Sequence, residues 1–451
     1  MGRRPGDDRS AKGKDEGKAL KSETIFALAS APGRAGVAVV RVSGPGAGAT
    51  LRVLAGELPL PRAATLRTLK HRDAEIDRAL AIWFPGPHSF TGEDVVEFHI
   101  HGGRAVREAL FGALADLGLR PAEPGEFSRR AVEHGRLDLT RAEAIADLVD
   151  AETPVQLRQA LSQYDGALAA LYESWRSALI AALAHAEAAI DFSDDGVGET
   201  EFDAARAGAR KIIATIEHHL DDHRRGEALR EGLRLTILGP PNAGKSSLIN
   251  ALARRDAAIV SEFPGTTRDV IELRLNLGGY LVHVADTAGL RETNDAVEAE
   301  GVRRALAQAK ASDLVLLLRD GTAPYTEHMN ITPDLLVWNK SDLAGFQKRD
   351  GVALSLKSGE GLPELIAVLT ALVAARLETK GEAPALTRPR HRAALGEALI
   401  SLRHSLSAPS GQPELFAEDL RLALRAIGRI TGQVDIEELL DQVFRDFCIG
   451  K

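Results

Sequence analysis

One stretch of this sequence, residues 233–250, limits the possible folds more than any other. It reads LRLTILGPPNAGKSSLIN, in which the apolar residues 235–238 predict a buried strand and the last residues follow a helical pattern. The segment GPPNAGKS (239–246) between them has the spacing of a phosphate-binding loop in its strand–loop–helix setting. Its glycines let backbone N–H groups turn toward phosphates, Lys245 can reach the β- and γ-phosphates, and the Ser246 hydroxyl can bind Mg²⁺. The stretch therefore predicts a nucleotide site in an α/β domain.

A second motif predicts which base is bound. A short apolar strand, 336–338, leads into Asn339-Lys340-Ser341-Asp342. The Asp342 carboxylate can accept hydrogen bonds from the N1–H and 2-amino groups of guanine. Adenine lacks this pair of donors, and the unpaired acceptor would cost about 1–3 kcal/mol. We expect a further base contact from the backbone of 355–357 (Ser355, Leu356 and Lys357), and the ligand is predicted to be GTP.

The residues predicted to act on the γ-phosphate lie between these motifs. Asp286 can hold Mg²⁺ through water, and the N–H of Gly289 can reach the γ-phosphate. Thr267, in the segment GTTRD, is predicted to close over Mg²⁺ when that phosphate is present. Leu290 stands where many GTPases carry a water-orienting glutamine, and a leucine cannot orient water. Catalysis must therefore recruit another group, which we expect in the acidic segment 291–300.

Composition limits the location and the partners of the chain. Its 451 residues have room for roughly three domains. Cys448 is the single cysteine, which excludes an intrachain disulfide and favours a reducing cytoplasm. No apolar run approaches the ~20 residues of a membrane span, and the charged residues 1–22 predict a disordered extension. A net charge of −8 does not favour a large autonomous nucleic-acid surface.

We expect an α/β and α+β multidomain protein. The N-terminal part predicts strands near residues 24–30, 36–42, 79–84 and 94–101, then a helix at 104–117. His99 and His101 share one strand face and could bind a metal, but no third ligand is evident, so we interpret them as structural or pocket-lining. From 137 to 230 the pattern is helical. The expected segments are an extension (1–22), an N-terminal α+β domain (23–136), a first helical part (137–231), a nucleotide domain (232–376) and a second helical part (377–451).

An apolar stripe at three- and four-residue steps marks the first helical part, and we interpret it as the core of a bundle. Its members are Leu157, Leu161, Tyr164, Leu168, Leu171, Trp175, Leu179 and Leu183. Residues 191–202 are expected to form an acidic loop. The basic cluster 388–392 (RPRHR) is interpreted as a solvated helix start. Helices on both sides of the nucleotide domain are expected to pack into one discontinuous bundle.

Several motifs together resemble one family. GPPNAGKSS, GTTRD, DTAGLRE and the terminal FCIGK (447–451) are similar to the MnmE/TrmE family of tRNA wobble-uridine modification GTPases. The resemblance extends to TGED (91–94), PGEF (124–127), LDL (137–139) and AEAIAD (142–147), and covers nearly all of 24–451. It implies a folate-binding N-terminal domain, a helical domain and an inserted Ras-like GTPase domain.

The resemblance also implies how GTP is cut. In this family two GTPase domains meet across their nucleotides, and a K⁺ ion replaces an arginine finger. The K⁺ ligands would be the Asn242 side chain and carbonyl groups around Ser261, Phe263 and Thr266, and Glu298 would position water. From the residues alone, the less favoured alternatives are that Glu298 is a solvated helix carboxylate and Asn242 an ordinary loop residue. The full set expected around GTP is Asn242, Ala243, Gly244, Lys245, Ser246, Ser247, Ser261, Glu262, Phe263, Pro264, Gly265, Thr266, Thr267, Asp286, Thr287, Ala288, Gly289, Asn339, Lys340, Asp342, Ser355, Leu356 and Lys357.

A second site follows from the same resemblance. A tetrahydrofolate derivative, in its 5-formyl or methylene form, would contact Arg41, Glu97, Arg136 and Lys451. Cations suit the carboxylates of the folate, and a carboxylate suits the pterin donors. Each of these residues is also compatible with an ordinary ion pair. Cys448 is either a nucleophile in one-carbon transfer or a small residue that places the tail.

The implied function involves partners. The family acts as a homodimer with a flavoprotein of the MnmG/GidA type, in a heterotetramer or a larger complex, on tRNA. Together they add an aminomethyl or carboxymethylaminomethyl group to carbon-5 of the wobble uridine. No flavin-binding glycine fingerprint is evident in this sequence, so FAD is expected on the partner. Two alternatives are a GTPase switch in RNA or ribosome assembly and a scaffold for a flavoprotein.

Overall fold

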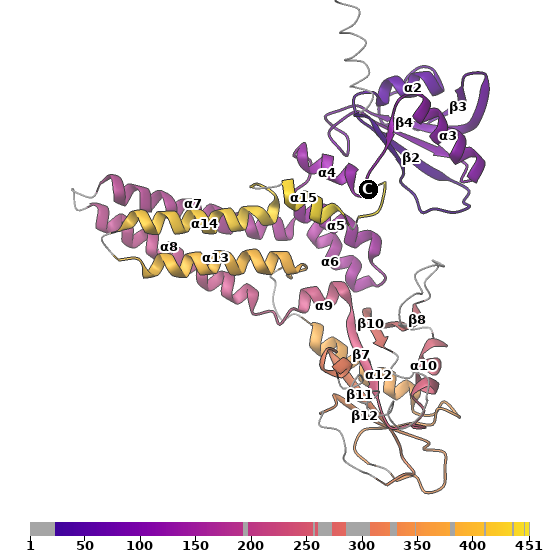
Figure 1. Ribbon diagram of the computed structural model, residues 1–451. Helices are drawn as coiled ribbons and strands as arrows, with labels where there is room; N and C mark the ends of the chain where they lie inside the picture. The colour runs from indigo at the N-terminus through magenta and orange to yellow at the C-terminus, as the bar shows by residue number, and fades with distance from the viewer. Residues whose placement is uncertain are drawn as a thin grey trace, which may run out of the picture. The chain divides into compact units, whose positions relative to one another are not determined.

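The computed structural model describes residues 23–192, 197–255, 258–259, 273–285, 307–324, 332–347, 349–378, 384–409, 412–434, 437–445 and 447–450. They form two compact units, one of residues 1–146 with 428–451 and one of residues 147–427 (Figure 1). No helix in these described ranges has both the length and the apolar character of a membrane span.

The described strands of the first unit form one sheet in the order β3-β4-β5-β2-β1-β6. They are β1 (Ile25–Leu28), β2 (Ala38–Ser43), β3 (Thr65–His71), β4 (Ala74–Phe84), β5 (Val95–Ile100) and β6 (Arg120–Pro121). Neighbours are antiparallel except β1 and β6. The helices α2 (Ala47–Ala55) and α3 (Arg104–Asp116) pack on the sheet through Leu51 and Leu110. This confirms the predicted α+β domain.

The strand β3 is absent from the sequence-based prediction. Its leucines, Leu66 and Leu69, are three residues apart, whereas a strand with one buried face alternates with a period of two. A three-residue step places the two leucines on opposite faces of β3, and the register shift with β4 lies beyond both, between Leu69 and Lys70. Leu69 is buried, whereas Leu66 is exposed.

The rest of the first unit is helical. It contains α4 (Glu126–Glu133), the beginning of α5 (Leu139–Asp150) and α15 (Glu437–Phe444). Leu139, Ala142, Leu440, Phe444 and Phe447 form a small core of their own. The end of the chain therefore belongs to the unit that contains the N-terminal sheet.

The second unit contains a helical bundle and a sheet domain. The bundle helices are α6 (Pro154–Tyr164), α7 (Ala167–Asp191), α8 (Val197–Leu220), α9 (Arg225–Glu231), α13 (Pro389–Ser407) and α14 (Pro413–Thr431). α8 lies against α7 and also against α13, which follows the inserted domain in the sequence (Figure 1). Phe202 and Phe416 meet edge to face, with ring centroids 5.2 Å apart. The discontinuous bundle is thus confirmed.

Two interpretations of the bundle sequence are wrong. The apolar stripe is not one core, because Leu157 and Leu161, each 43% exposed, and Tyr164, 40% exposed, lie on the surface of α6. A capping box of Thr153 and Gln156 starts α6, and Gly166, with a φ of 96°, separates it from α7. Only the α7 part of the stripe is largely buried. Residues 197–202, expected in the acidic loop, form the first turns of α8 instead. The reason is that Phe202 is buried by packing in the bundle, which favours helix over an exposed loop.

The basic cluster 388–392 is not a solvated helix start. His391 is fully buried. Arg388 donates to Asp147 at 2.6 Å, and Arg392 donates to Asp222 at 2.6 Å and to Glu227 at 2.9 Å. The cluster therefore ties the start of α13 to α9 and to the end of α5.

The inserted domain has a sheet in the order β13-β12-β11-β7-β10-β9-β8 within the described residues. Its strands are β7 (Leu233–Leu238), β8 (Ala258–Ile259), β9 (Leu273–Leu277), β10 (Tyr280–Ala285), β11 (Leu314–Asp320), β12 (Leu335–Asn339) and β13 (Val352–Ala353). The neighbouring strands β13, β12, β11, β7 and β10 are parallel to one another, and β9 is antiparallel to both β10 and β8. α10 (Lys245–Ala253) and α12 (Leu362–Leu377) share its core. Parallel order brings the carboxyl ends of β7 and β12 to one edge.

Candidate nucleotide and one-carbon sites

The loop between β7 and α10 has two glycines with no room for a side chain. A Cβ on Gly239 would lie 2.2 Å from the Leu318 carbonyl oxygen, and one on Gly244 would lie 2.5 Å from Asn339 Nδ2. Gly244 also has a φ of 104°, a conformation that favours glycine. Helix α10 begins at the next residue and leaves its first N–H groups available to an anion. This local structure suits the binding of phosphates.

The side chains predicted to hold the phosphates lie in and around this loop. Lys245 Nζ donates to the carbonyl oxygens of Gly239, at 2.8 Å, and Pro240, at 3.0 Å. Ser246 and Ser247 are exposed at the start of α10. The structure also places Asn242, exposed with a φ of 61°, and the buried Ala243 in the loop.

Asn339 joins the loop to the predicted base site. It is only 5% exposed. Its Nδ2 donates to the Ala243 carbonyl at 2.9 Å, and its Oδ1 accepts from the N–H groups of Lys340 at 2.8 Å and Leu356 at 3.1 Å. One buried side chain therefore fixes the phosphate loop, the 339–342 motif and the 355–357 segment relative to one another.

An ion pair fixes the side chain of Lys340 in the base motif. Lys340 has a φ of 68°, and its Nζ lies 2.5 Å from Asp320 Oδ2. Partial burial acts to raise the pKa of Asp320, but the hydrogen bonds from Lys340 and Thr322 together lower it by more. The pKa of Asp320 therefore falls below its usual range. Asp342 is exposed, Ser355 is buried, and Ser358 N–H donates to Ser355 Oγ at 3.1 Å.

The predicted residues that would close over the γ-phosphate lie outside the described residues. They are Ser261, Glu262, Phe263, Pro264, Gly265, Thr266, Thr267, Asp286, Thr287, Ala288, Gly289 and Glu298, and Lys451 of the predicted folate set also lies outside.

Two of the predicted folate residues are in direct contact. Arg41 on β2 donates from Nε and Nη2 to Glu97 Oε1 on β5, at 3.0 and 2.8 Å. The two strands pair these residues in register. The Arg41 guanidinium lies 5.2 Å from the ring centroid of Phe90 and 5.7 Å from that of Phe127. Phe127 is fully buried, whereas Phe90 is partly exposed, so the ring of Phe90 beside the cation–carboxylate pair is the one that can offer a flat apolar surface to a heterocycle.

The third predicted folate residue lies near the loop that carries Phe90. A Cβ on Gly92 would meet His134 Cβ at 2.9 Å and Arg136 Cγ at 3.3 Å. His134 Nδ1 lies 2.7 Å from the Thr91 carbonyl.

The two histidines considered as metal ligands each lie beside a carboxylate. His99 Nε2 lies 3.4 Å from Glu97 Oε2, and His101 Nδ1 lies 2.8 Å from Asp77 Oδ1. The described residues contain no group of three or more potential metal ligands.

The C-terminal segment is anchored in the same unit. Gly125 N–H donates to the Cys448 carbonyl at 3.3 Å, and Pro124 pairs with Ile449 in an antiparallel bridge. Gly450 has a φ of 101°, and a Cβ there would lie 2.1 Å from the Leu28 carbonyl oxygen. Cys448 itself is exposed and has no disulfide.

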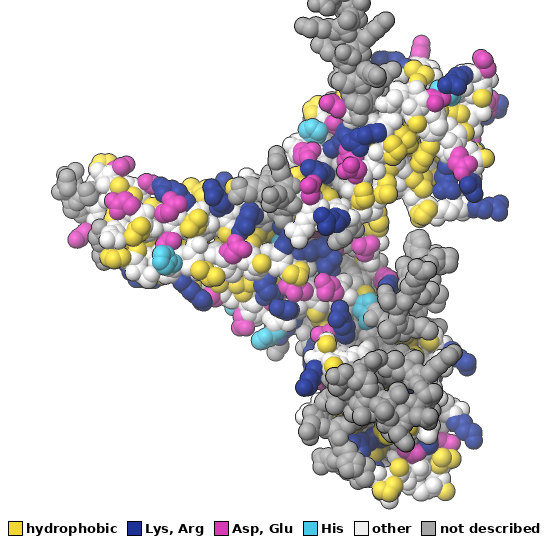
Figure 2. Space-filling model, viewed as in Figure 1, with side chains coloured by type: hydrophobic (Ala, Val, Ile, Leu, Met, Phe, Trp, Pro, Cys, Tyr) yellow, Lys and Arg dark blue, Asp and Glu magenta, His cyan; other side chains and the backbone are white. Residues whose placement is uncertain are grey.

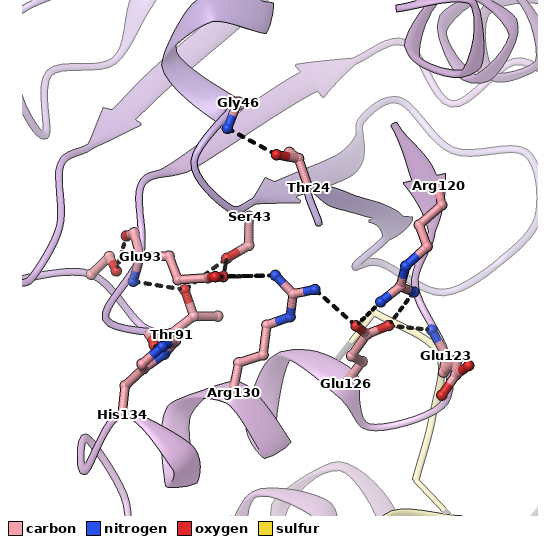
Figure 3. Close-up of polar contacts among 11 residues, drawn as sticks. Thr24, Ser43, Gly46, Thr91, Glu93, Arg120, Glu123, Glu126, Arg130 and His134 are labelled. Carbon is pink, nitrogen blue, oxygen red and sulfur yellow. Dashed lines mark hydrogen bonds and ion pairs between the residues drawn. The ribbon is translucent and has the colours of Figure 1, made fainter. Parts of the chain in front are cut away.

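A chain of charged side chains runs beside this anchor (Figure 3). Arg120 donates to both carboxylate oxygens of Glu126, at 2.5 and 2.8 Å. Arg130 donates to Glu126 at 3.0 Å and to Glu93 at 2.9 and 3.2 Å. Burial raises the pKa of Glu126, but hydrogen bonds from Arg120 and the Glu123 N–H, with the charge of Arg130, lower it below its usual range.

Comparison with known proteins shows which family the chain belongs to. The family model of the MnmE helical domain matches residues 139–448, and that of the GTP-binding protein TrmE N-terminus matches residues 24–136. The tRNA modification GTPase MnmE of Paramagnetospirillum magneticum is 55% identical over 444 residues, which cover 95% of this chain and 100% of the relative. The chain belongs to the MnmE family.

A second MnmE relative agrees with this assignment. The MnmE of Rhodospirillum rubrum, also named a tRNA modification GTPase, is 54% identical over 455 residues, with 95% of this chain and 99% of the relative covered. Among solved structures, the G domain of the T. maritima FeoB iron transporter matches 31% of this chain and 98% of its own length, at 25% identity and a TM-score of 0.22. Membership of the MnmE family confirms the resemblance inferred from the motifs.

Sequence reasoning missed three features of these MnmE sites. It named Asn339 as a base-site residue but did not foresee that its side chain spans both motifs. It did not identify Asp320, the partner of Lys340, although a carboxylate at the end of an apolar strand was a visible signal. It quoted TGED and PGEF without assigning roles to Glu93 and Glu126, because their partner Arg130 becomes adjacent to both only in the folded chain.

Proposed function

We propose that this chain is a GTPase of tRNA modification that binds GTP between the loop 239–246 and the motif 339–342. The observation that carries this proposal is the position of Asn339, which bonds the phosphate loop and the 355–357 backbone with one buried side chain. Asp342 follows at the exposed end of that motif, where its carboxylate would select guanine.

The choice of base is tested by Asp342→Asn. A carboxamide offers an N–H donor that suits the 2-oxo group of xanthine but not the 2-amino group of guanine. We expect GTP affinity to fall roughly 100-fold and XTP affinity to rise, because a buried hydrogen-bond mismatch is costly. Titration with fluorescent analogues of both nucleotides measures the change. Asp350→Asn, at an exposed position nearby, should leave the preference for GTP intact.

Hydrolysis is proposed to use ions held around the loop. Ser246 and Thr267 would bind Mg²⁺, Lys245 would neutralise the phosphates, and Glu298 would position the attacking water. The Asn242 side chain and carbonyl groups around Ser261, Phe263 and Thr266 would hold K⁺ when two GTPase domains meet. The exposure of Asn242 at the rim of the loop supports its availability to an ion.

We expect turnover to be much faster in K⁺ than in Na⁺. Glu298→Ala should abolish turnover and leave GTP affinity nearly unchanged, because it removes a contact made only in the transition state. Phosphate release in the two salts and a nucleotide titration measure both effects. Glu300→Ala serves as the control. Equal rates in K⁺ and Na⁺ would rule out the cation mechanism.

The N-terminal domain is proposed to bind a tetrahydrofolate derivative. Arg41, Glu97, Arg136 and Lys451 would hold it, and Cys448 would act as a nucleophile or place the tail. The Arg41–Glu97 pair and the partly exposed ring of Phe90 support this proposal, since they combine charge with a flat apolar surface.

A homodimer and an MnmG-type flavoprotein that carries FAD complete the proposed cytoplasmic complex, which acts on tRNA. Figure 2 shows hydrophobic side chains that gather on one face of the N-terminal domain. Leu66 and Leu80, paired across β3 and β4, are 67% and 41% exposed. Exposed apolar surface of this kind favours association.

A further inference from the structure

The charged chain of Figure 3 lies in the N-terminal unit and is largely buried. The side chains of Glu126, Arg130 and Glu93 are 9%, 12% and 18% exposed. Removing ionised groups from water is costly unless each is paired, and here every carboxylate has an arginine partner. Such a network is weak evidence for stability, but it fixes the relative positions of the segments that carry it.

Arg130 is the branch point of this network. Its Nη2 bonds Glu126 at the start of α4, and its Nη1 bonds Glu93 in the loop between β4 and β5. A guanidinium presents its donors in a rigid plane, so one side chain holds both carboxylates at a set separation. In Figure 3 the Arg130 guanidinium lies between the two carboxylates.

At one end, the network fixes the turn that receives the C-terminal segment. Glu126 accepts from the Glu123 N–H at 2.9 Å and thereby closes the turn 123–126. Gly125 in this turn has a φ of 66°, and a Cβ there would meet Phe444 Cδ1 and Phe447 Cβ, each at 2.9 Å. Since Gly125 and Pro124 also pair with the backbone of Cys448 and Ile449, the position of Cys448 depends on this turn.

At the other end, the network fixes the loop that covers Arg41. Ser43 Oγ donates to Glu93 at 2.8 Å and lies 2.7 Å from Thr91 Oγ1. Ser89 Oγ donates to the Glu93 carbonyl at 2.5 Å. Phe90, between Ser89 and Thr91, is thus held where its ring meets the Arg41 guanidinium.

We propose that Arg130 is a positioning residue, which sets the distance between the C-terminal segment around Cys448 and the Arg41–Phe90 surface. The inference rests on the proposed one-carbon site, because these are the two surfaces that would face a bound folate. Arg130 touches neither surface and acts through Glu93 and Glu126.

The test uses the full-length chain with Glu93→Gln and Arg130→Met combined. This double variant leaves no unpaired carboxylate, and the Arg120–Glu126 pair remains, so the domain is expected to fold. Hydrogen exchange by mass spectrometry then reports on residues 85–94 and on the C-terminal segment. Both should exchange faster, by roughly tenfold, because the loop and the turn are no longer joined.

Folate binding is the second readout. Affinity for 5-formyltetrahydrofolate should fall roughly tenfold, which is about 1.4 kcal/mol, while GTP turnover stays at the original rate. Arg130→Lys, which keeps the charge but not the planar fork, should recover part of the affinity. Arg78→Met is the matched control, since Arg78 makes an exposed pair with Glu75 and should change neither readout.

The outcomes separate this inference from the proposed function. If the double variant keeps its exchange pattern and its folate affinity, the positioning role of Arg130 is wrong. If the original chain does not bind folate, the proposed one-carbon site is wrong, and the exchange data still decide whether Arg130 joins the loop to the C-terminal segment.

Discussion

Single side chains in this protein act by joining segments that are far apart in sequence. Asn339 joins the phosphate loop to the base motif, and Arg130 joins a strand-connecting loop to a helix start. Both residue types could be read from the sequence, but their partners could not, because no local pattern reports a contact between distant residues. Removing a buried polar group of this kind costs more than its net contribution, since its partners are left unpaired.

The buried side chain of His219 should make the stability of the protein depend on pH. It lies against Trp175, with ring centroids 5.3 Å apart, and against Tyr172 at 6.5 Å. Its pKa is lowered from 6.5 to about 4, mainly by burial and also by the charges of Arg392, His391 and His218, against the opposing charge of Asp222. The folded state therefore resists a proton that the unfolded chain accepts, so stability is full above pH 6.5 and falls as the pH drops toward 4.

We expect this term to cost on the order of 2 kcal/mol at pH 5. His219→Gln cannot take up a proton and should lose less stability between pH 7 and pH 5 than the original chain. Thermal unfolding followed by tryptophan fluorescence at the two pH values measures it. His218→Gln, at an exposed position on the same helix, is the control, and equal acid losses in the two variants would contradict this account.

At the scale of elements, periodicity predicted helices well and burial less well. The stripe from Leu157 to Leu183 correctly indicated helix, but Gly166 divides it, and the α6 part faces solvent. The cluster 388–392 had the composition of a solvated helix end, yet Arg392 bridges Asp222 and Glu227. Both errors have one cause, because amphipathicity shows which residues share a face but not what that face meets.

A pair of leucine substitutions tests the division of the stripe. Leu179→Ala, at a fully buried position on α7, should lower the free energy of unfolding by about 2–5 kcal/mol through lost burial and a cavity. Leu161→Ala, on exposed α6, should change it by less than about 0.5 kcal/mol. Urea unfolding of the two variants measures the difference. Similar losses would show that the α6 face is covered.

At the scale of the whole molecule, sequence order and spatial grouping differ. Residues 428–451 belong to the unit of the N-terminal sheet, although a complete α/β domain intervenes along the chain. Leu440 and Phe444 pack with Leu139 and so help to hold the last residues in that unit. The proposed function therefore needs the N-terminal domain and residues 428–451 as well as the inserted domain.

Complementation tests this requirement. In cells that lack the protein, the carbon-5 modification of the wobble uridine should disappear, as measured by mass spectrometry of tRNA nucleosides. The full chain should restore it, whereas Glu298→Ala and a chain that ends at Phe447 should not, because one lacks turnover and the other lacks the C-terminal segment. Expression levels of all three are the control. Unaltered modification in the deletion strain would favour the role in RNA or ribosome assembly.

The sequence by itself determined the phosphate loop, the guanine motif, the helical character of residues 137–230 and the family, because each depends on residue types at short, fixed spacings. The tertiary structure alone decided which face of α6 is solvent-exposed, which acids Arg392 and Arg130 pair with, and which unit receives the C-terminal segment. These are contacts between distant residues, and whether a charge is solvated or a leucine buried depends on what the rest of the chain places against it.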